Sequence, residues 1–121
     1  NNIHFHKYVD NPMGFMNAGD ILCLPSFREG FGNVIIESGA CGLTCIGSNI
    51  YGITDAIINK KTGLLFSKGD VEDLEKKMKL LIKNTKKREE LSKNAFLHVK
   101  SNYNQLNYIK SFLEIIRTQI S

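Results

Sequence analysis

Three short, largely apolar runs constrain this chain more than any other feature of its sequence. They are Ile21–Leu24, residues 44–47 and residues 64–66, and the first two are followed by loops that contain glycine and serine, residues 26–32 and residues 48–52. A continuous apolar run of this length is typical of a strand buried on both faces of a parallel sheet. Because helical segments alternate with the runs, right-handed βαβ crossovers are favoured. We therefore expect an α/β fold whose ligand site lies at the carboxyl ends of the strands.

Other local signals predict one further strand and several helices. Residues 3–6 are expected to form a short strand. Asn11 and Pro12 have the pattern of an N-cap followed by the first residue of a helix. A helix is expected from residue 33 to residue 41, ending at Gly42, and a helical turn at residues 53–58. Beyond Asp70, an N-cap, the chain is expected to be helical, with a second helix over residues 86–101 and a third that carries Ile109, Phe112, Leu113, Ile116 and Ile120.

The chain of 121 residues has room for one domain, and 42% of its residues are hydrophobic, which is enough for a core. It begins without Met, basic n-region or apolar leader, so we expect it to be part of a longer protein. The sequence predicts a single, incomplete domain, residues 1–121. Residues 1–69 form its βα core and residues 70–121 a helical segment.

Charge and cysteine content test other classes of function. Residues 1–59 carry a net charge of −3 and residues 60–121 a net charge of +7. A basic half suits an anionic membrane surface or a nucleic acid, or is simply a set of solvated helix faces. No nucleic-acid motif accompanies it, so a basic nucleic-acid-binding domain is the less favoured alternative. Cys23, Cys41 and Cys45 form no C-x-x-C pair, and no metal site is expected.

The loop at residues 26–32 carries the strongest candidate chemistry. It follows a strand and precedes a helix, so backbone N–H groups and the positive end of the helix dipole face the loop, an arrangement suited to phosphate. Glu29 and Glu37 bracket the helix start, and a carboxylate can accept hydrogen bonds from two sugar hydroxyls. The alternative is a pair of solvated acids. For Arg28, phosphate binding and plain exposure both stay open.

The segment from Glu29 to Glu37, EGFGNVIIE, matches the E-x7-E signature of the retaining group 1 glycosyltransferases. Residues 17–26 resemble the stretch AADVFVLPS of that family, and residues 39–46 resemble AMACGLPVI, with Thr44 in place of the usual proline. Residues 48–55 and 62–66 match the segments that follow. The resemblance covers at least residues 3–83.

This resemblance implies a fold and a set of binding residues. The family has the GT-B fold of two facing Rossmann-like domains, and this chain resembles part of the C-terminal, sugar-nucleotide-binding domain. Glu29 would contact the transferred sugar as the catalytic-site residue, and Glu37 would hold the ribose. The other donor-binding residues implied are Arg28, Gly30, Phe31, Gly32 and Asn33, with Tyr8 and Val9 near the base.

The implied reaction transfers a hexose-type sugar from a nucleoside diphosphate sugar to a glycan or lipid-linked acceptor. UDP or GDP is the expected nucleotide, and no metal or other cofactor is expected.

The expected partners are the nucleotide sugar and the N-terminal acceptor domain, which this chain lacks. A homodimer through the truncated edge of the sheet is also expected, and nucleic acid is not. The expected location is the cytoplasm, with an anionic membrane surface at its inner face as a further partner. The fragment alone should be inactive. The alternative is a non-catalytic nucleotide-binding module.

Overall fold

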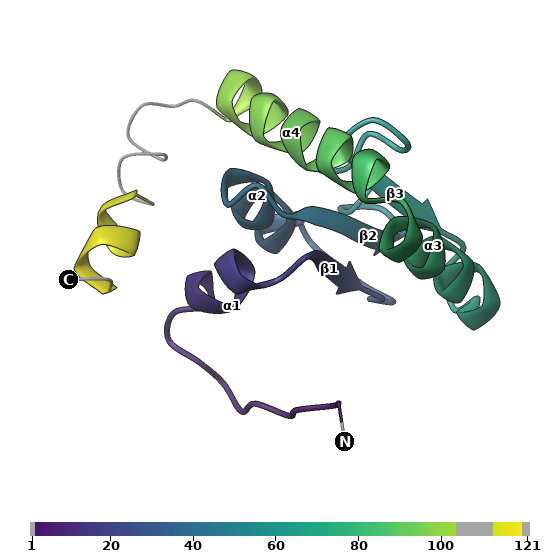
Figure 1. Cartoon of the computed structure of the whole chain (residues 1–121), viewed down its shortest axis with the longest axis horizontal. Helices are drawn as coiled ribbons and strands as arrows, with labels where there is room; N and C mark the ends of the chain where they lie inside the picture. Colours follow the sequence, from purple (N-terminus) through teal and green to yellow (C-terminus); the bar gives the residue numbers. More distant parts are fainter. Residues whose placement is uncertain (1, 104–112, 120–121) are drawn as a thin grey trace.

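The computed structural model describes residues 2–103 and 113–119. It is an α/β structure in which helices flank an open, three-stranded parallel sheet (Figure 1), as the sequence predicts. The three strands predicted from the apolar runs are all present, and β2 and β3 are each one residue longer than expected. In chain order the elements are α1 (Met13–Ala18), β1 (Ile21–Leu24), α2 (Asn33–Ala40), β2 (Thr44–Ser48), β3 (Gly63–Phe66), α3 (Val71–Lys83) and α4 (Thr85–Asn102).

The strand β2 lies at the centre of the sheet, between β1 and β3. Both pairings are parallel, with Leu22 opposite Cys45 and Ile46 opposite Leu64. Every residue of β2 is buried, whereas every residue of β1 is only half-buried. Among the described residues no strand pairs with the outer edge of β1, so β1 is an edge strand.

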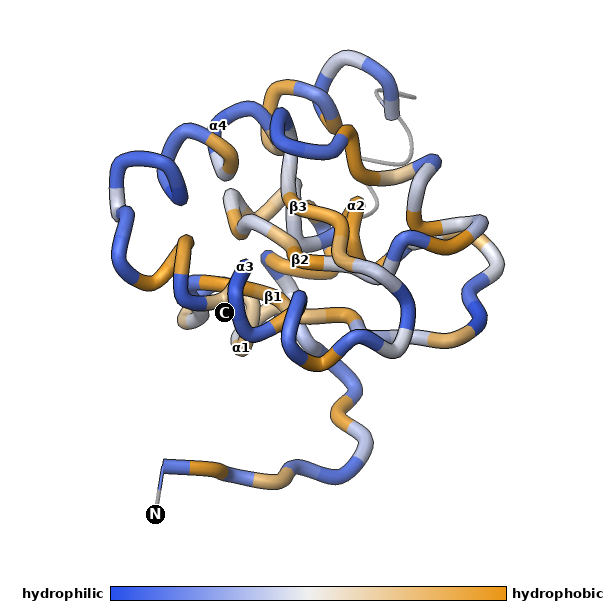
Figure 2. Tube along the Cα trace, turned by 90° about the vertical axis from the view of Figure 1, so that its right-hand side faces the viewer, coloured by the Kyte–Doolittle hydropathy of each residue, from blue (hydrophilic) through white to orange (hydrophobic). Residues whose placement is uncertain are grey.

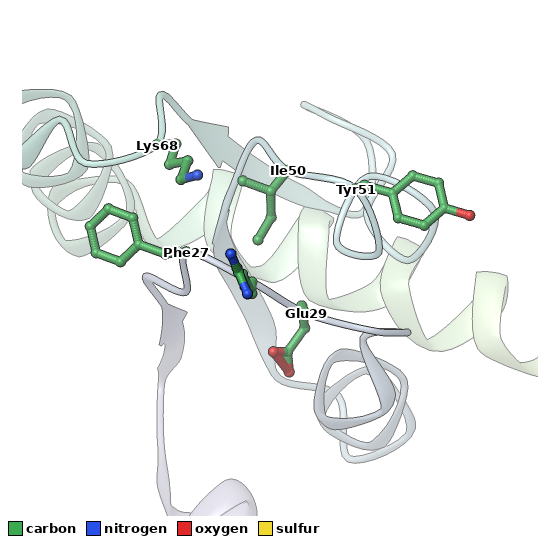
Figure 3. Close-up of a pocket in the computed structure, with 6 residues that line it drawn as sticks. Phe27, Glu29, Ile50, Tyr51 and Lys68 are labelled. Carbon is green, nitrogen blue, oxygen red and sulfur yellow. The ribbon is translucent and has the colours of Figure 1, made fainter.

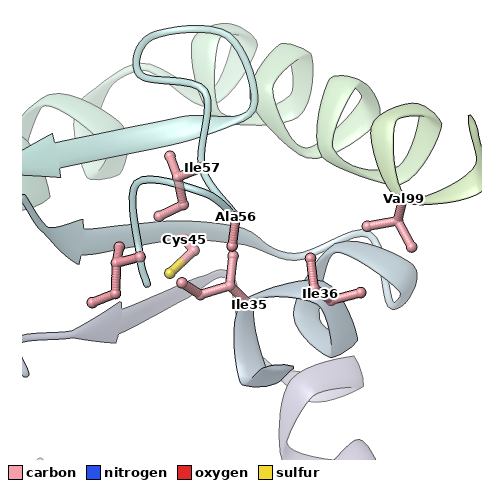
Figure 4. Packing of buried hydrophobic residues seen from close by; sticks show 7 residues of the cluster. Ile35, Ile36, Cys45, Ala56, Ile57 and Val99 are labelled. Atoms are coloured by element: carbon pink, nitrogen blue, oxygen red, sulfur yellow. The ribbon is translucent and has the colours of Figure 1, made fainter. Parts of the chain in front are cut away.

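Two hydrophobic clusters cover the two faces of the sheet. Successive strand residues point to opposite faces, so Cys45 and Ile46 belong to different clusters. Helix α4 contributes Val99 to the first cluster and Leu91 to the second. Figure 2 shows the result, with apolar strands inside and the hydrophilic surfaces of α3 and α4 outside. The buried members of the first cluster (Figure 4) are Ile35, Ile36, Cys45, Ile53, Ala56, Ile57 and Val99, and those of the second are Ile46, Leu64, Phe66, Leu81 and Leu91.

The helix ends follow the sequence signals. The helix α1 begins at Met13 with Pro12 as its N-cap, one position later than predicted, and the amide of Met13 donates to the side-chain oxygen of Asn11 at 3.1 Å. At the end of α2, Leu43 donates to the carbonyl of Ser38 and Gly42 to that of Gly39, both at 2.9 Å. These two bonds form a Schellman motif. The Asp70 carboxylate accepts from the amide of Asp73 at 3.0 Å, capping α3.

Three further expectations have different outcomes. The predicted strand at residues 3–6 is wrong. That segment is not in a strand, and Phe5 is 94% exposed. A short apolar stretch becomes a strand only beside another strand, and none of the described strands lies there. The helical turn predicted at residues 53–58 is present, with the amide of Ile57 donating to the carbonyl of Ile53 at 3.0 Å. Of the predicted third helix, residues 113–119 are helical, whereas Ile109, Phe112 and Ile120 lie outside the described residues.

Candidate functional site: a pocket at the carboxyl ends of the strands

The loops that follow β1 and β2 are packed directly against each other. The amide of Gly32 donates to the carbonyl of Gly52 at 3.4 Å. A Cβ atom at Gly52 would lie 2.5 Å from the carbonyl oxygens of both Glu29 and Gly30, and the φ of Gly52 is +92°. Both the space and the backbone torsion therefore require glycine at this position. The close contact fixes the backbone of Glu29.

The start of α2 leaves some backbone amides without an acceptor. Among the donor-binding residues that the family resemblance implies, the amide of Gly32 donates to the carbonyl of Gly52, and that of Asn33 donates to the carbonyl of Phe31 at 2.5 Å. Within the described residues the amides of Phe31 and Val34 have no acceptor. The free donors at the positive end of this helix are therefore Phe31 and Val34, which alters the predicted set.

Three loops, one from the carboxyl end of each strand, line a pocket of about 500 Å³ (Figure 3). The sequence predicted a ligand site at the loops after β1 and β2, and it gave no role to the turn after β3, which also lines this pocket. Parallel strands place their carboxyl ends at one edge of a sheet, which is the signal that could have found it. The residues that line the pocket are Phe27, Arg28, Glu29, Ile50, Tyr51 and Lys68.

The pocket holds two cations and one carboxylate. Within the described residues, Arg28, Lys68 and Glu29 make no ion pair within 4.0 Å. The Lys68 ammonium lies 5.7 Å from the centre of the Phe27 ring, a cation–π contact. The Glu29 side chain is half-buried and Arg28 is exposed. The pocket can therefore offer hydrogen-bond acceptors to hydroxyls and positive charge to an anion.

Glu37 does not lie in this pocket. It is half-buried on α2, and burial raises the pKa of its carboxyl group. The pKa of the Cys41 thiol is also raised, first by burial and then by the charge of Glu37. Because Cys41 lies 3.6 Å from Met13 between their sulfur atoms, Glu37 is on the side of α2 that faces α1. The structure thus places Glu29 and Glu37 at different positions around the start of α2.

An aromatic contact joins the glycine loop to the end of α4. The rings of Phe31 and Tyr103 have centroids 6.0 Å apart, and the Tyr103 hydroxyl donates to the carbonyl of Asp55 at 3.5 Å. Burial, and next the charge of Asp55, raise the pKa of Tyr103. Tyr103 therefore contacts two of the three loops that contribute to the pocket, those after β1 and β2, a role that the sequence gave no reason to expect.

The remaining candidate residues lie apart from the pocket. Gly30 is exposed, and a Cβ atom there would meet nothing within 4 Å. Tyr8 is 91% exposed, and neither Tyr8 nor Val9 lines the pocket. In residues 2–103 and 113–119, no three histidine, cysteine, aspartate or glutamate side chains gather as a metal site would require.

The fold and the site define a Rossmann-like domain with a loop-built pocket at the carboxyl ends of its strands. Residues 1–98 match the family model for the glycosyl transferases group 1, and the chain belongs to this family. It is 33% identical over 102 residues to the capsular polysaccharide biosynthesis glycosyltransferase CapM of Staphylococcus aureus, covering 84% of this chain and 27% of CapM.

A second relative is the N,N'-diacetylbacillosaminyl-diphospho-undecaprenol alpha-1,3-N-acetylgalactosaminyltransferase of Campylobacter jejuni. It is 35% identical over 118 residues, which are 95% of this chain and 31% of that enzyme. The chain therefore spans less than a third of the length of these two relatives. The solved structure of Anabaena HepE in complex with UDP-glucose superposes with a TM-score of 0.73 and 22% identity, over 86% of this chain and 29% of HepE. This likeness shows the shared fold, that of the GT-B glycosyltransferases.

Proposed function

We propose that this chain is the donor-binding portion of a retaining glycosyltransferase. The whole enzyme would transfer a hexose-type sugar from a nucleoside diphosphate sugar to a glycan or a lipid-linked acceptor. One observation carries the proposal: Glu29, in the family's signature segment, lines a pocket at the carboxyl ends of the strands together with two cations that have no ion-pair partner in the described part of the chain. HepE is named as a UDP-glucose complex, and the Campylobacter relative as an enzyme that uses a lipid diphosphate.

The proposed chemistry assigns a role to each group. The bond between the sugar's anomeric carbon and the diphosphate oxygen breaks, a bond from that carbon to an acceptor hydroxyl oxygen forms, and the proton of that hydroxyl passes to the departing diphosphate. The Glu29 carboxylate would accept hydrogen bonds from sugar hydroxyls and so orient the ring. The cations and the free amide of Phe31 would stabilise the negative charge that develops on the departing diphosphate. On this proposal no metal is needed, and Glu37 would hold the ribose hydroxyls.

A binding experiment tests the donor site. UDP, GDP and ADP are titrated into the labelled chain, and amide shifts of Gly30 to Glu37 are followed by NMR. We expect one nucleotide to bind, and Glu37→Ala to weaken it about tenfold through loss of a charge-assisted hydrogen bond. Glu89→Ala is the control, because Glu89 is exposed on α4 and outside the pocket lining. A folded sample that shows no shift with any nucleotide contradicts the proposal.

The chain alone is expected to transfer no sugar, because transfer needs donor and acceptor held in contact with water excluded. The exposed edge of β1 is expected to cause self-association, since unpaired strand edges pair with other strands. Radiolabelled sugar nucleotides with sugar and lipid acceptors test the first expectation, and analytical ultracentrifugation tests the second. Rapid turnover by a monomer contradicts both. A longer protein that contains this sequence provides the remaining test. If the nucleotide binds but the longer protein does not transfer sugar, a non-catalytic nucleotide-binding module becomes the better account.

The proposed location is the cytoplasm, with contact to an anionic membrane at its inner face. Within residues 2–103 and 113–119, no helix is long and apolar enough to cross a bilayer. The exposed lysines Lys76, Lys79 and Lys83 lie along one side of α3, although Lys79 pairs with Glu75 at 2.6 Å. Sedimentation with anionic and neutral liposomes tests the contact, and equal binding to both contradicts it.

A further inference from the structure

The peptide group between Gly30 and Phe31 carries one of the free donors at the start of α2. Its N–H has no acceptor among the described residues. Its carbonyl oxygen packs against Gly52, where a Cβ atom would lie 2.5 Å from it, and accepts no hydrogen bond in the described part of the chain. Packing at Gly52 thus restrains one end of the peptide group. The direction of the N–H therefore also depends on how the Phe31 side chain is held at the other end.

Tyr103, the residue that follows α4, provides the contact for that side chain. The centroids of the Phe31 and Tyr103 rings are 6.0 Å apart, with an angle of 59° between the ring planes. Among the described residues Phe31 has no other ring contact. The Phe31 ring is 45% exposed and belongs to neither of the two hydrophobic clusters of the sheet. The Tyr103 ring therefore connects Phe31 to the rest of the fold.

Tyr103 is itself fixed from several directions. Its amide donates to the carbonyl of Val99 at 2.9 Å, and its side chain packs against the first hydrophobic cluster. Its hydroxyl donates to the carbonyl of Asp55, in the turns that follow β2. The ring of His98 meets it edge to face, with the centroids 6.0 Å apart. A ring with these contacts can restrict the motion of the Phe31 ring beside it.

We propose that Tyr103 is a positioning residue for the donor site: by holding the Phe31 side chain, it fixes the direction in which the Phe31 amide meets the ligand. Tyr103 does not line the pocket, so it acts through Phe31 and not by touching the ligand. A loop that is not held in the competent arrangement binds more weakly, because only the competent fraction of molecules takes up the ligand. The inference rests on the proposed function, which gives the Phe31 amide its role.

Three variants of the 121-residue chain separate the ring of Tyr103 from its contribution to the core. Tyr103→Leu keeps an apolar side chain but removes the ring, and Tyr103→Phe keeps the ring but removes the hydroxyl. We expect Tyr103→Leu to weaken UDP binding about fivefold, the effect of one aromatic pair, and Tyr103→Phe to retain it. Phe96→Leu is the matched control. Phe96 is exposed on α4, makes no ring contact within the described residues and does not line the pocket.

Two NMR measurements show whether Tyr103 acts through Phe31. Without ligand, the heteronuclear NOE of the Phe31 amide should fall in Tyr103→Leu and keep its wild-type value in Tyr103→Phe and Phe96→Leu. With UDP, Phe31→Leu keeps the amide but removes the ring, so Tyr103→Leu should have little further effect in that background. An effect of Tyr103→Leu on UDP binding that is the same with and without the Phe31 ring would overturn the inference.

The outcomes separate this inference from the proposed donor site. Equal binding of UDP to the wild-type chain and Tyr103→Leu would uphold the donor site and overturn the positioning role. Absence of UDP binding to the wild-type chain, with a Phe31 NOE that falls only in Tyr103→Leu, would contradict the donor site and leave the hold of Tyr103 on the loop in place. Equal weakening in Phe96→Leu would show a general loss of stability and overturn the inference. Loss of native amide dispersion in Tyr103→Leu would make Tyr103 a residue of the fold alone, which overturns it too.

Discussion

The strands β1 and β2 are neighbours of nearly equal length, yet they differ in burial and in what they contribute to the domain. All five residues of β2 are buried between two hydrophobic clusters, whereas all four residues of β1 are half-buried. The loop with Glu29 follows the less buried strand, and the loop that holds it in place follows the more buried one. The difference indicates that the buried strand stabilises the domain, while the edge strand positions the binding loop and relies on its neighbour for rigidity.

The largest effect should come from shortening a side chain in β2. Ile46 is fully buried, so Ile46→Ala should lower the free energy of unfolding by about 2–5 kcal/mol through lost burial and a residual cavity. Leu22→Ala in β1 should cost about 1 kcal/mol, because that side chain is half-buried. Urea unfolding followed by circular dichroism measures both. Equal losses would remove the distinction between the two strands.

The next effect concerns Gly52, where the loop after β2 packs against the loop after β1. Gly52→Ala should lower the free energy of unfolding by about 2 kcal/mol, because the methyl group meets two carbonyl oxygens and φ is positive. The substitution should also weaken the binding of any ligand in the pocket. Gly14→Ala is the control, since a Cβ atom there meets nothing within 4 Å in helix α1, and alanine favours a helix. A Gly52→Ala protein as stable as the Gly14→Ala protein would contradict this role.

A smaller effect, in the opposite direction, is expected at the first residue of β2. The Thr44 hydroxyl is fully buried and has no hydrogen-bond partner among the described residues. Thr44→Val keeps the shape and removes the unsatisfied group, so the free energy of unfolding should rise by about 1 kcal/mol. Ser38→Ala should lower it instead, because the Ser38 hydroxyl donates to Ile35 at 2.9 Å. Thermal unfolding in parallel distinguishes the two, and destabilisation by Thr44→Val would reveal a partner for the hydroxyl.

The smallest effect is a pH dependence on α2, which connects the two strands. Burial raises the pKa of Glu37 in the folded chain above its value in the unfolded chain. The unfolded state therefore loses this proton first, and Glu37 destabilises the fold as pH rises from the unfolded pKa, near 4.5, through the folded one. Relative to Glu37→Gln, the wild-type chain should lose stability across that window. Unfolding curves at several pH values test this, and a difference that is constant with pH would contradict it.

Local patterns predicted much of this fold. The Asp70 cap, the Gly42 helix end and the strand Ile21–Leu24 depend on neighbouring residues, and the structure has all three. Residues 3–6 have an equally good local pattern, but a strand needs a partner, which no local pattern supplies. Prediction therefore succeeded where the cause lies within one turn or one strand.

The site was predicted only along one segment. The sequence singled out Glu29 because a signature begins there, and it left Arg28 open between phosphate binding and plain exposure. Lys68 and Tyr103 reach the pocket or its loops from 40 or more positions further along the chain, through the parallel sheet and the course of α4. Glu37 is eight positions from Glu29, yet the helix turns it toward α1. Proximity in sequence was thus a poor guide to membership of the pocket.

Helix α4 contributes side chains to both clusters, Leu91 on one face of the sheet and Val99 on the other. A helix shared in this way couples the two clusters, because neither cluster can open without breaking its contacts with α4. Amide hydrogens in α2 and in β3 should therefore exchange with one common opening free energy, as a single cooperative unit. The loop at residues 26–32 contacts this unit through Phe31 and Tyr103, so we expect the pocket to open only when the whole domain does.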